Sequence, residues 1–211
     1  MKLKQIIILS SILSLVGCGS ILGPQTKRAT QTYQLNDGRD LNQKMGLCKS
    51  YTHSSVLYVS APDVVLPYSD YKIYYSTESY LINSYAYSQW AIPVSGMVHQ
   101  NMMQSLTNAC LFKGVSSNSS IVTADYRLIS SVRIIRHEMN TNKDSYKAHL
   151  LIFNELINVK DNELIGSFLY DDTKQTDGTP IGFVKSSSDL LSDYDAKLVD
   201  WVAKTVAKNP E

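Results

Sequence analysis

The chain has 211 residues, of which 44% are hydrophobic and 18% charged, and its formal net charge is +1. That length suits one domain of ordinary size with a sizeable core. The charge balance excludes a strongly basic surface, so no nucleic-acid partner is expected. Fourteen tyrosines are an unusual number for this length, and they favour a protein rich in strands or half-wet interfaces.

The first residues predict a bacterial lipoprotein signal peptide over residues 1–17. Lys2 and Lys4 give it a positive start, and an apolar stretch follows over residues 6–15. That stretch is shorter than the roughly 20 residues that a membrane-spanning helix needs. Leu15-Val16-Gly17-Cys18 then matches a lipobox. Cys18 is therefore the expected site of lipid attachment; the alternative is an ordinary secretory signal with a chance cysteine near its cleavage site.

Acyl chains on Cys18 would hold the mature chain on a membrane, since two or more chains anchor stably. Gly19 and Ser20 follow the cysteine, where an Asp would retain the protein in the inner membrane. The expected location is the periplasmic face of the outer membrane, with the inner membrane as the alternative. Residues 18–30 are polar and contain Gly and Pro, so they read as a lipidated tether. A dozen extended residues reach roughly 40 Å.

Two cysteines remain once Cys18 carries lipid. Cys48 and Cys110 are an even number of thiols in an oxidising compartment, which favours a disulfide between them. The alternative is that both are small buried hydrophobic residues.

The first half of the domain, which we place at residues 31–211, reads as strands followed by a helix. A short strand is expected at 33–35 and a better one at 55–61. Tyr-rich segments at 71–75 and 80–90 predict a hairpin. Pro93 then opens a helix expected to run to Phe112, with an apolar strip at four-residue spacing.

Three long strands are expected in the second half, at 125–138, 146–158 and 163–171, separated by polar turns. A polar loop over 171–182 and a helix over 188–208 complete the chain, with Ser188 as its N-cap. The expected fold is α+β, a mainly antiparallel sheet with two helices packed on one face.

Alternation along the first of these long strands predicts which side chains face the core. Leu128, Val132 and Ile134 are expected on the buried face, with Arg127 and Arg133 on the other. By the same reading His137 and Glu138, beside a turn, are expected to be solvated surface residues.

Motifs that carry chemistry are lacking. The sequence contains no nucleophile elbow, phosphate-binding loop or dinucleotide fingerprint. Its four histidines are scattered, and none has metal-binding helical spacing. Asp171, Asp172 and Asp177 lack the ligand spacing of a calcium loop. No catalytic residue, metal or cofactor is therefore predicted, and the chain is expected not to be an enzyme.

Residues 80–106, YLINSYAYSQWAIPVSGMVHQNMMQSL, resemble a hallmark of the ABC-type transport auxiliary lipoproteins. These small lipoproteins accompany MCE-domain lipid transport systems, including the Pqi system. In that family a Tyr-rich strand leads to a Trp, a Pro-containing link and the first helix, and here Trp90 and Pro93 occupy those places. Residues 124–128, ADYRL, and Trp201 also fit the family pattern. The sequence departs from it at Gln89, where the family often has a basic residue.

The resemblance implies a non-enzymatic accessory subunit that docks an MCE assembly to the outer membrane. An MCE-domain protein is then the expected partner, with a second copy of the chain as another candidate. Tyr85, Tyr87 and Trp90 are candidate contact residues; alternatively Trp90 fills the gap between strand and helix. Two other functions stay open, a lipid carrier with its own apolar pocket and an envelope scaffold or regulator of a cell-wall synthase.

Changing Cys18→Ala is expected to abolish incorporation of radiolabelled palmitate into the chain, because the thiol of Cys18 accepts the diacylglyceryl group. The Cys48→Ala variant serves as the control and should keep the label. Palmitate labelling that persists in the Cys18→Ala chain would show that the acyl group lies elsewhere.

Overall fold

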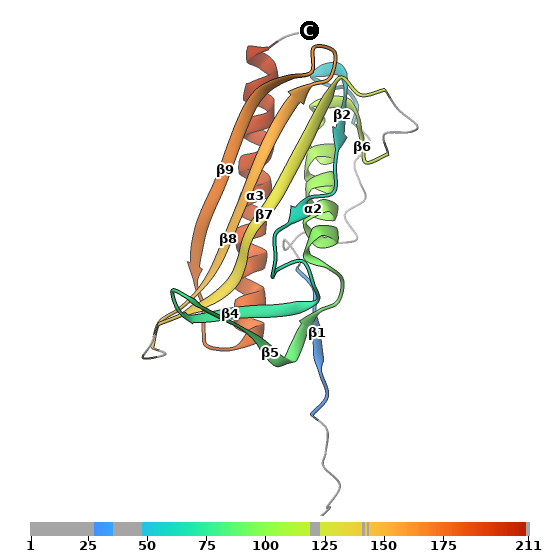
Figure 1. Cartoon of the computed structure of the whole chain (residues 1–211). Coiled ribbons are helices and arrows are strands. Elements are labelled where there is room, and N and C mark those ends of the chain that lie inside the picture. Colours follow the sequence, from blue (N-terminus) through green and yellow to red (C-terminus); the bar gives the residue numbers. More distant parts are fainter. Residues whose placement is uncertain (1–27, 36–47, 119–122, 141, 143, 210–211) are drawn as a thin grey trace, which may run out of the picture.

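The computed structural model describes residues 28–35, 48–118, 123–140, 142 and 144–209. These residues form nine strands and two long helices, in the order β1–β5, α2, β6–β9, α3 (Figure 1). The signal peptide and Cys18 lie outside the described residues, so the lipobox stays a sequence prediction. Among the described residues, no helix is both long and apolar enough to cross a membrane.

The strands differ greatly in length, and the three longest follow one another in the second half of the chain. The two helices are α2 (Val94–Asn108) and α3 (Pro180–Lys208). The strands are β1 (Gln31–Tyr33), β2 (His53–Val59), β3 (Asp63–Val64), β4 (Lys72–Glu78), β5 (Leu81–Trp90), β6 (Phe112–Ser116), β7 (Tyr126–Met139), β8 (Tyr146–Asn158) and β9 (Glu163–Gln175).

The sheet is mixed, so the expectation of a mainly antiparallel sheet is wrong, although the α+β class holds. Among the described strands, β4–β5, β7–β8 and β8–β9 pair antiparallel. Five other pairs are parallel: β1–β5, β2–β6, β2–β7, β3–β7 and β4–β7. Antiparallel neighbours are joined by short turns that the sequence reveals. Parallel neighbours need long crossover connections, so their pairing leaves no local signal.

Both helices lie on one face of the sheet, as expected, and α3 runs along β8 and β9 (Figure 1). The 13 residues of β8 and the 29 residues of α3 both span about 43 Å, so one helix covers the full length of the long strands. The apolar side chains between them are almost fully buried: Ala148, Leu150, Ile152 and Leu156 from β8, and Leu191, Leu198 and Val202 from α3.

A buried polar cluster fixes α3 on the sheet. The Asn154 side chain is fully buried on β8, and its Oδ1 accepts hydrogen bonds from Ser130 Oγ of β7 at 2.7 Å and from Tyr194 Oη of α3 at 2.8 Å. Its Nδ2 donates to the carbonyl of Phe168 on β9 at 3.3 Å. One amide thus joins three strands and a helix, and an amide buried without these partners would be strongly destabilising.

Helix α3 begins eight residues before the expected start at residue 188. Thr179 is its N-cap, and the Thr179 hydroxyl accepts a hydrogen bond from the Gly182 amide at 3.1 Å. Pro180 occupies the first helical position, where its missing N–H costs nothing. Ser188 is instead a buried residue inside the helix, where small side chains allow close packing. Strand β9 likewise runs on to Gln175, through part of the expected loop.

Helix α2 ends at Asn108, four residues before the expected end. Cys110 has a positive φ of 52°, which breaks the helical path. Phe112 then begins β6, which pairs with β2. The strand β6 was not predicted, because its five residues follow an apolar helical strip without a polar break.

The structure joins Cys48 to Cys110 in a disulfide. Their Cα atoms are 5.6 Å apart, within the range that such a bond requires. The bond ties the segment before β2 to the link between α2 and β6. It closes a sequence separation of 62 residues.

Removing this disulfide with the Cys48→Ala/Cys110→Ala pair should lower the free energy of unfolding by about 4 kcal/mol, the chain-entropy value for a loop of this size. Urea unfolding of both chains, each with and without reductant, measures this. Reductant should shift only the natural chain, and equal midpoints for the two oxidised chains would contradict the expectation.

Candidate functional site

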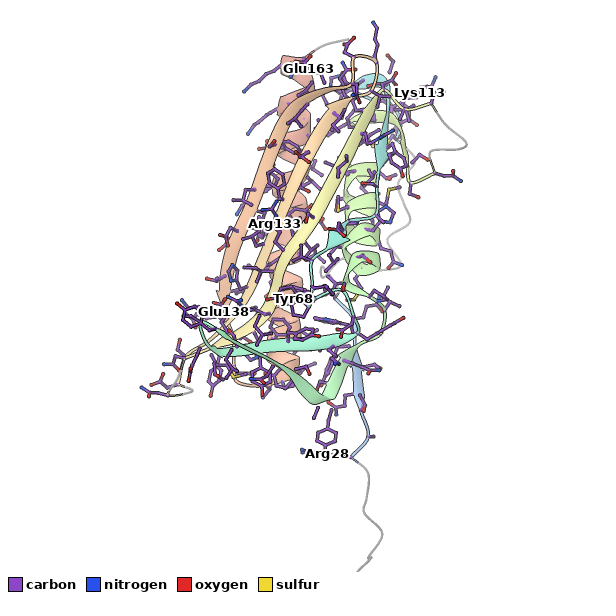
Figure 2. The ribbon with its side chains drawn as sticks, viewed as in Figure 1. Arg28, Tyr68, Lys113, Arg133, Glu138 and Glu163 are labelled. Atoms are coloured by element: carbon purple, nitrogen blue, oxygen red, sulfur yellow. A yellow bond between two sulfur atoms is a disulfide. The ribbon has the colours of Figure 1, made fainter. Side chains whose placement is uncertain are left out.

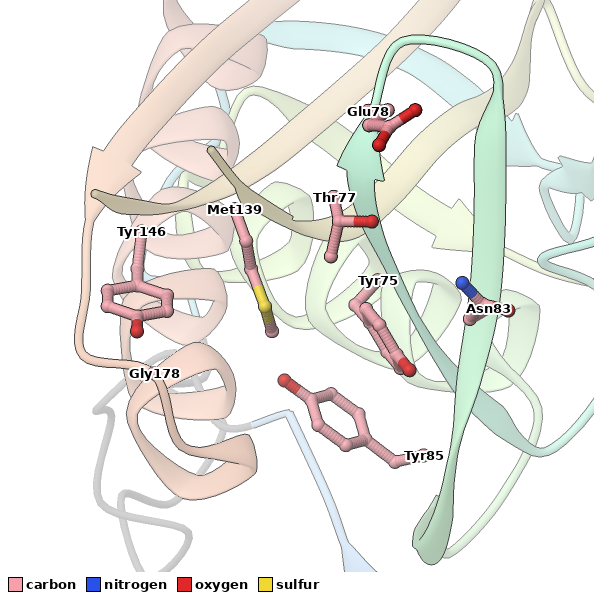
Figure 3. A pocket seen from close by; sticks show the side chains of 8 residues that line it. All are labelled: Tyr75, Thr77, Glu78, Asn83, Tyr85, Met139, Tyr146 and Gly178. Carbon is pink, nitrogen blue, oxygen red and sulfur yellow. The ribbon is translucent and has the colours of Figure 1, made fainter. Parts of the chain in front are cut away.

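A cavity of about 540 Å³ opens between the β4–β5 hairpin, the β7–β8 tip and the loop before α3 (Figure 3). We call it the tyrosine pocket. Figure 3 shows tyrosine and methionine side chains from these segments pointing into one hollow. Its lining residues are Tyr75, Thr77, Glu78, Asn83, Tyr85, Met139, Tyr146 and Gly178.

Aromatic rings form the walls of the tyrosine pocket. Tyr75 on β4 and Tyr85 on β5 pack with ring centroids 4.8 Å apart. Tyr146, the first residue of β8, lies against the backbone of Gly178. A Cβ atom at position 178 would come within 2.8 Å of the Tyr146 ring, so a larger residue there would displace that ring.

His137 lies behind the pocket, fully buried and stacked on Phe183 of α3 at 5.3 Å between ring centroids. The Tyr85 hydroxyl lies 2.7 Å from His137 Nδ1 and donates to it in the neutral tautomer that carries its proton on Nε2. Burial lowers the pKa of His137 to about 4, against the opposing charge and backbone of Asp177. Burial also raises the pKa of Tyr85. Both groups are therefore neutral at pH 7, and their hydrogen bond positions Tyr85.

The burial of His137 corrects the expectation that it is a solvated surface residue. A register shift on β7 between Val132 and Ile134 adds one residue to the strand. Beyond the shift, side chains change face, so Ile135 and His137 point inward in place of Ile134. Alternation predicted the first half of β7 correctly and failed after this bulge.

The same shift places a charged cluster on the outer face of the sheet. Arg136 Nη2 lies 2.7 Å from Glu138 Oε1, and His149 Nδ1 lies 2.8 Å from the same oxygen. His149 Nε2 lies 2.8 Å from Asp171 Oδ1 on β9. The hydrogen bond from His149, together with Arg136, lowers the pKa of Glu138 to about 2, although burial opposes this. The bond to Glu138 raises the pKa of His149. The cluster links three strands through charge-assisted hydrogen bonds.

A second recess of about 390 Å³ lies where the described chain begins. We call it the tether groove, and it is formed by β1, β5 and the start of α3. The guanidinium of Arg28 lies 5.6 Å from the centre of the Tyr87 ring, a cation–π geometry. Tyr33 and the exposed Ile181 also line the groove.

The three candidate contact residues occupy different environments. Tyr87 is 49% exposed in the tether groove. Tyr85 lines both the groove and the tyrosine pocket. Trp90 is only 2% exposed and packs against Phe183, with ring centroids 6.0 Å apart, so it is a core residue between β5 and α3. Of the three, only Tyr87 presents a large open surface.

No group of three or more His, Cys, Asp or Glu in the described ranges could hold a metal ion. What the pocket and groove offer chemically is aromatic surface with a few polar groups at the rim, which suits binding. Sequence reasoning missed Tyr75, Tyr146 and His137. The high tyrosine count was the only signal, because these residues come from separate strands.

Comparison with solved structures shows that this chain shares its fold with other proteins. No family model matches the chain, and no curated protein matches it in sequence. Protein XCC0632 from Xanthomonas campestris, of the DUF330 family, has a TM-score of 0.69 at 15% identity, over 86% of this chain and 97% of that one. An uncharacterised protein has a TM-score of 0.63 at 13% identity, over 82% and 99%.

A weaker likeness is to lipoprotein GNA1162 from Neisseria meningitidis. Its TM-score is 0.40 at 11% identity, over 71% of this chain and 99% of that one. A score of this size does not establish a shared topology. The two stronger likenesses show the fold of this chain and assign no role to any residue.

The buried His137 should make the fold less stable as the pH falls. Its folded pKa of about 4 lies below the ordinary histidine pKa of 6.5, so the unfolded chain binds more protons between these values. The free energy of unfolding should therefore fall with decreasing pH, by at most about 1.4 kcal/mol per pH unit.

Urea unfolding at several values between about pH 6.5 and 5 measures this slope. The raised folded pKa of His149 opposes this slope near pH 6.5, and the lowered folded pKa of Glu138 adds to it near pH 5, so the contribution of His137 is the difference in slope between the natural chain and the His137→Phe variant. The His137→Phe variant should be less stable overall, because Tyr85 loses its acceptor, but should have a flatter slope. An unchanged slope would contradict the role of His137.

Proposed function

We propose that this chain is a lipoprotein of the bacterial envelope, anchored at the periplasmic face of the outer membrane by acyl chains on Cys18. In this proposal it is a non-enzymatic accessory component of an MCE/ABC-type phospholipid transport system. It docks the MCE assembly to the membrane, and the nucleotide-driven step belongs to another subunit. The chain itself carries no nucleotide-binding motif.

Two observations support the envelope location. The sequence Leu15-Val16-Gly17-Cys18 has the residue types of a lipobox at the end of an apolar stretch. The disulfide between Cys48 and Cys110 suits an oxidising compartment such as the periplasm.

Residues 80–106, which carry the resemblance to the auxiliary lipoproteins, form a strand, a short link and a helix. The Tyr-rich part is strand β5, which ends at Trp90. Pro93 is the N-cap of α2, so the link between strand and helix is short. The segment therefore has the strand, link and helix that the resemblance implies.

The tether groove is the observation that carries the docking role. Arg28 and Tyr87 are of the residue types that dominate the energetics of protein interfaces, and Tyr33 lies beside them. The groove lies at Arg28, ten residues after Cys18 in the sequence. A partner bound there would be held next to the membrane anchor.

The cavities formed by described residues favour docking over lipid carriage. The tyrosine pocket has Glu78 and Asn83 in its lining, and the tether groove has Arg28. A carrier needs an apolar enclosure for acyl chains, and both recesses have polar groups in their walls. A lipid carrier would reveal itself by phospholipid that co-purifies with the chain, and a cell-wall regulator by the partner it captures.

The Tyr87→Ala variant should weaken binding to the MCE-domain partner about tenfold or more, as expected for loss of an interface aromatic residue. Tyr51 is a matched control, because it is also 49% exposed. The measurement is co-purification of the partner from detergent-solubilised membranes, titrated for affinity.

Deleting the gene should also release the MCE protein from outer-membrane fractions. Unchanged fractionation would contradict the docking role. If Tyr51→Ala weakened binding as much as Tyr87→Ala, the docking site would not be the tether groove.

A further inference from the structure

The tip of the β4–β5 hairpin exposes three consecutive apolar or aromatic residues. Tyr80 is fully exposed, Leu81 is 45% exposed and Ile82 is 41% exposed. Consecutive exposed apolar residues are uncommon on protein surfaces unless they contact a partner or a membrane. The tip extends past the part of β4 that pairs with β7, which ends at Ser76 (Figure 1).

The hairpin lies at the end of the domain where the described chain begins. Arg28 is at this end, and Glu163 and Lys113 are at the opposite end (Figure 2). The first described residue therefore lies at the same end of the domain as the hairpin. Only nine residues separate Cys18 from Arg28 in the sequence.

The chemistry of the tip suits a lipid surface. Tyrosine has an apolar ring and a polar hydroxyl, and it is enriched where membranes meet water. Leu81 and Ile82 add aliphatic surface, and residues 79–83 contain no Lys or Arg. Contact with lipid at this tip would therefore depend on apolar burial and change little with salt.

We propose that the hairpin tip, Tyr80, Leu81 and Ile82, rests in the headgroup layer of the bilayer that holds the acylated Cys18. This inference rests on the lipid anchor of the proposed function and adds an orientation to it. The tyrosine pocket then opens beside the membrane surface, since Asn83 and Glu78 flank the tip and line it. Tyr87 is not part of this contact, because it lies with Arg28 in the tether groove, at the other end of β5 from the tip.

Because the lipid anchor already holds the chain at the membrane, a weak contact of the tip is enough to orient the domain. A short tether gives the tip an effective concentration at the surface on the order of millimolar. A contact too weak to recruit a free protein would therefore still hold the tethered domain in one orientation.

The test places a photoreactive benzoyl-phenylalanine at Tyr80 in the full acylated chain in cells. The matched control carries it at Leu164, which is 51% exposed and next to Glu163 at the far end. Both chains are irradiated and purified, and their adducts are identified by mass spectrometry. Phospholipid adducts should be several-fold more abundant from position 80 than from position 164.

Three results overturn the inference. They are equal lipid capture at both positions, no lipid capture at position 80, or capture of a protein in its place. Palmitate labelling and membrane fractionation of the same samples separate this from the proposed function. A chain that is acylated and membrane-bound but captures no lipid overturns the hairpin contact alone, whereas a chain without acyl groups overturns both.

Discussion

The side chain of Asn154 is the interaction on which the rest of the domain depends. It is buried at the centre of β8 and bonds to Ser130, Tyr194 and the Phe168 carbonyl, so that three strands and α3 share one amide. Apolar burial is non-directional, so it specifies the position of the 29-residue helix less sharply than hydrogen bonds do. A buried amide has partners in one register only, because any shift leaves polar atoms unsatisfied.

The fixed register of α3 also builds the end of the molecule where the recesses lie. The start of α3 places Phe183 between Trp90 and His137. His137 then holds the Tyr85 hydroxyl, and Tyr85 separates the tyrosine pocket from the tether groove. A change at the far end of α3 would therefore reach both recesses through helix position rather than through direct contact.

Local sequence patterns predicted most helices and strands, but they did not predict which distant strands pair. The strand β8 was predicted at its observed bounds, 146–158, because polar turns flank an alternating run. The parallel pairing of β2 with β6 and β7 has no such signal, so the sheet was expected to be mainly antiparallel. One bulge on β7 reversed the faces beyond Val132 and hid His137. The candidate contact at Tyr87 was visible from sequence, whereas the tyrosine pocket required the fold to bring its strands together.

The orientation of the domain on the bilayer is measured most directly by energy transfer from a fluorescent amino acid to acceptor lipids. The acylated chain is reconstituted in vesicles with the fluorophore at Tyr80, in the hairpin tip, or at Glu163, at the end of the domain opposite Arg28 (Figure 2). In the proposed orientation the hairpin end faces the membrane, so transfer should be much stronger from position 80. Equal transfer from both positions, or stronger transfer from position 163, would contradict a domain that stands on its hairpin end.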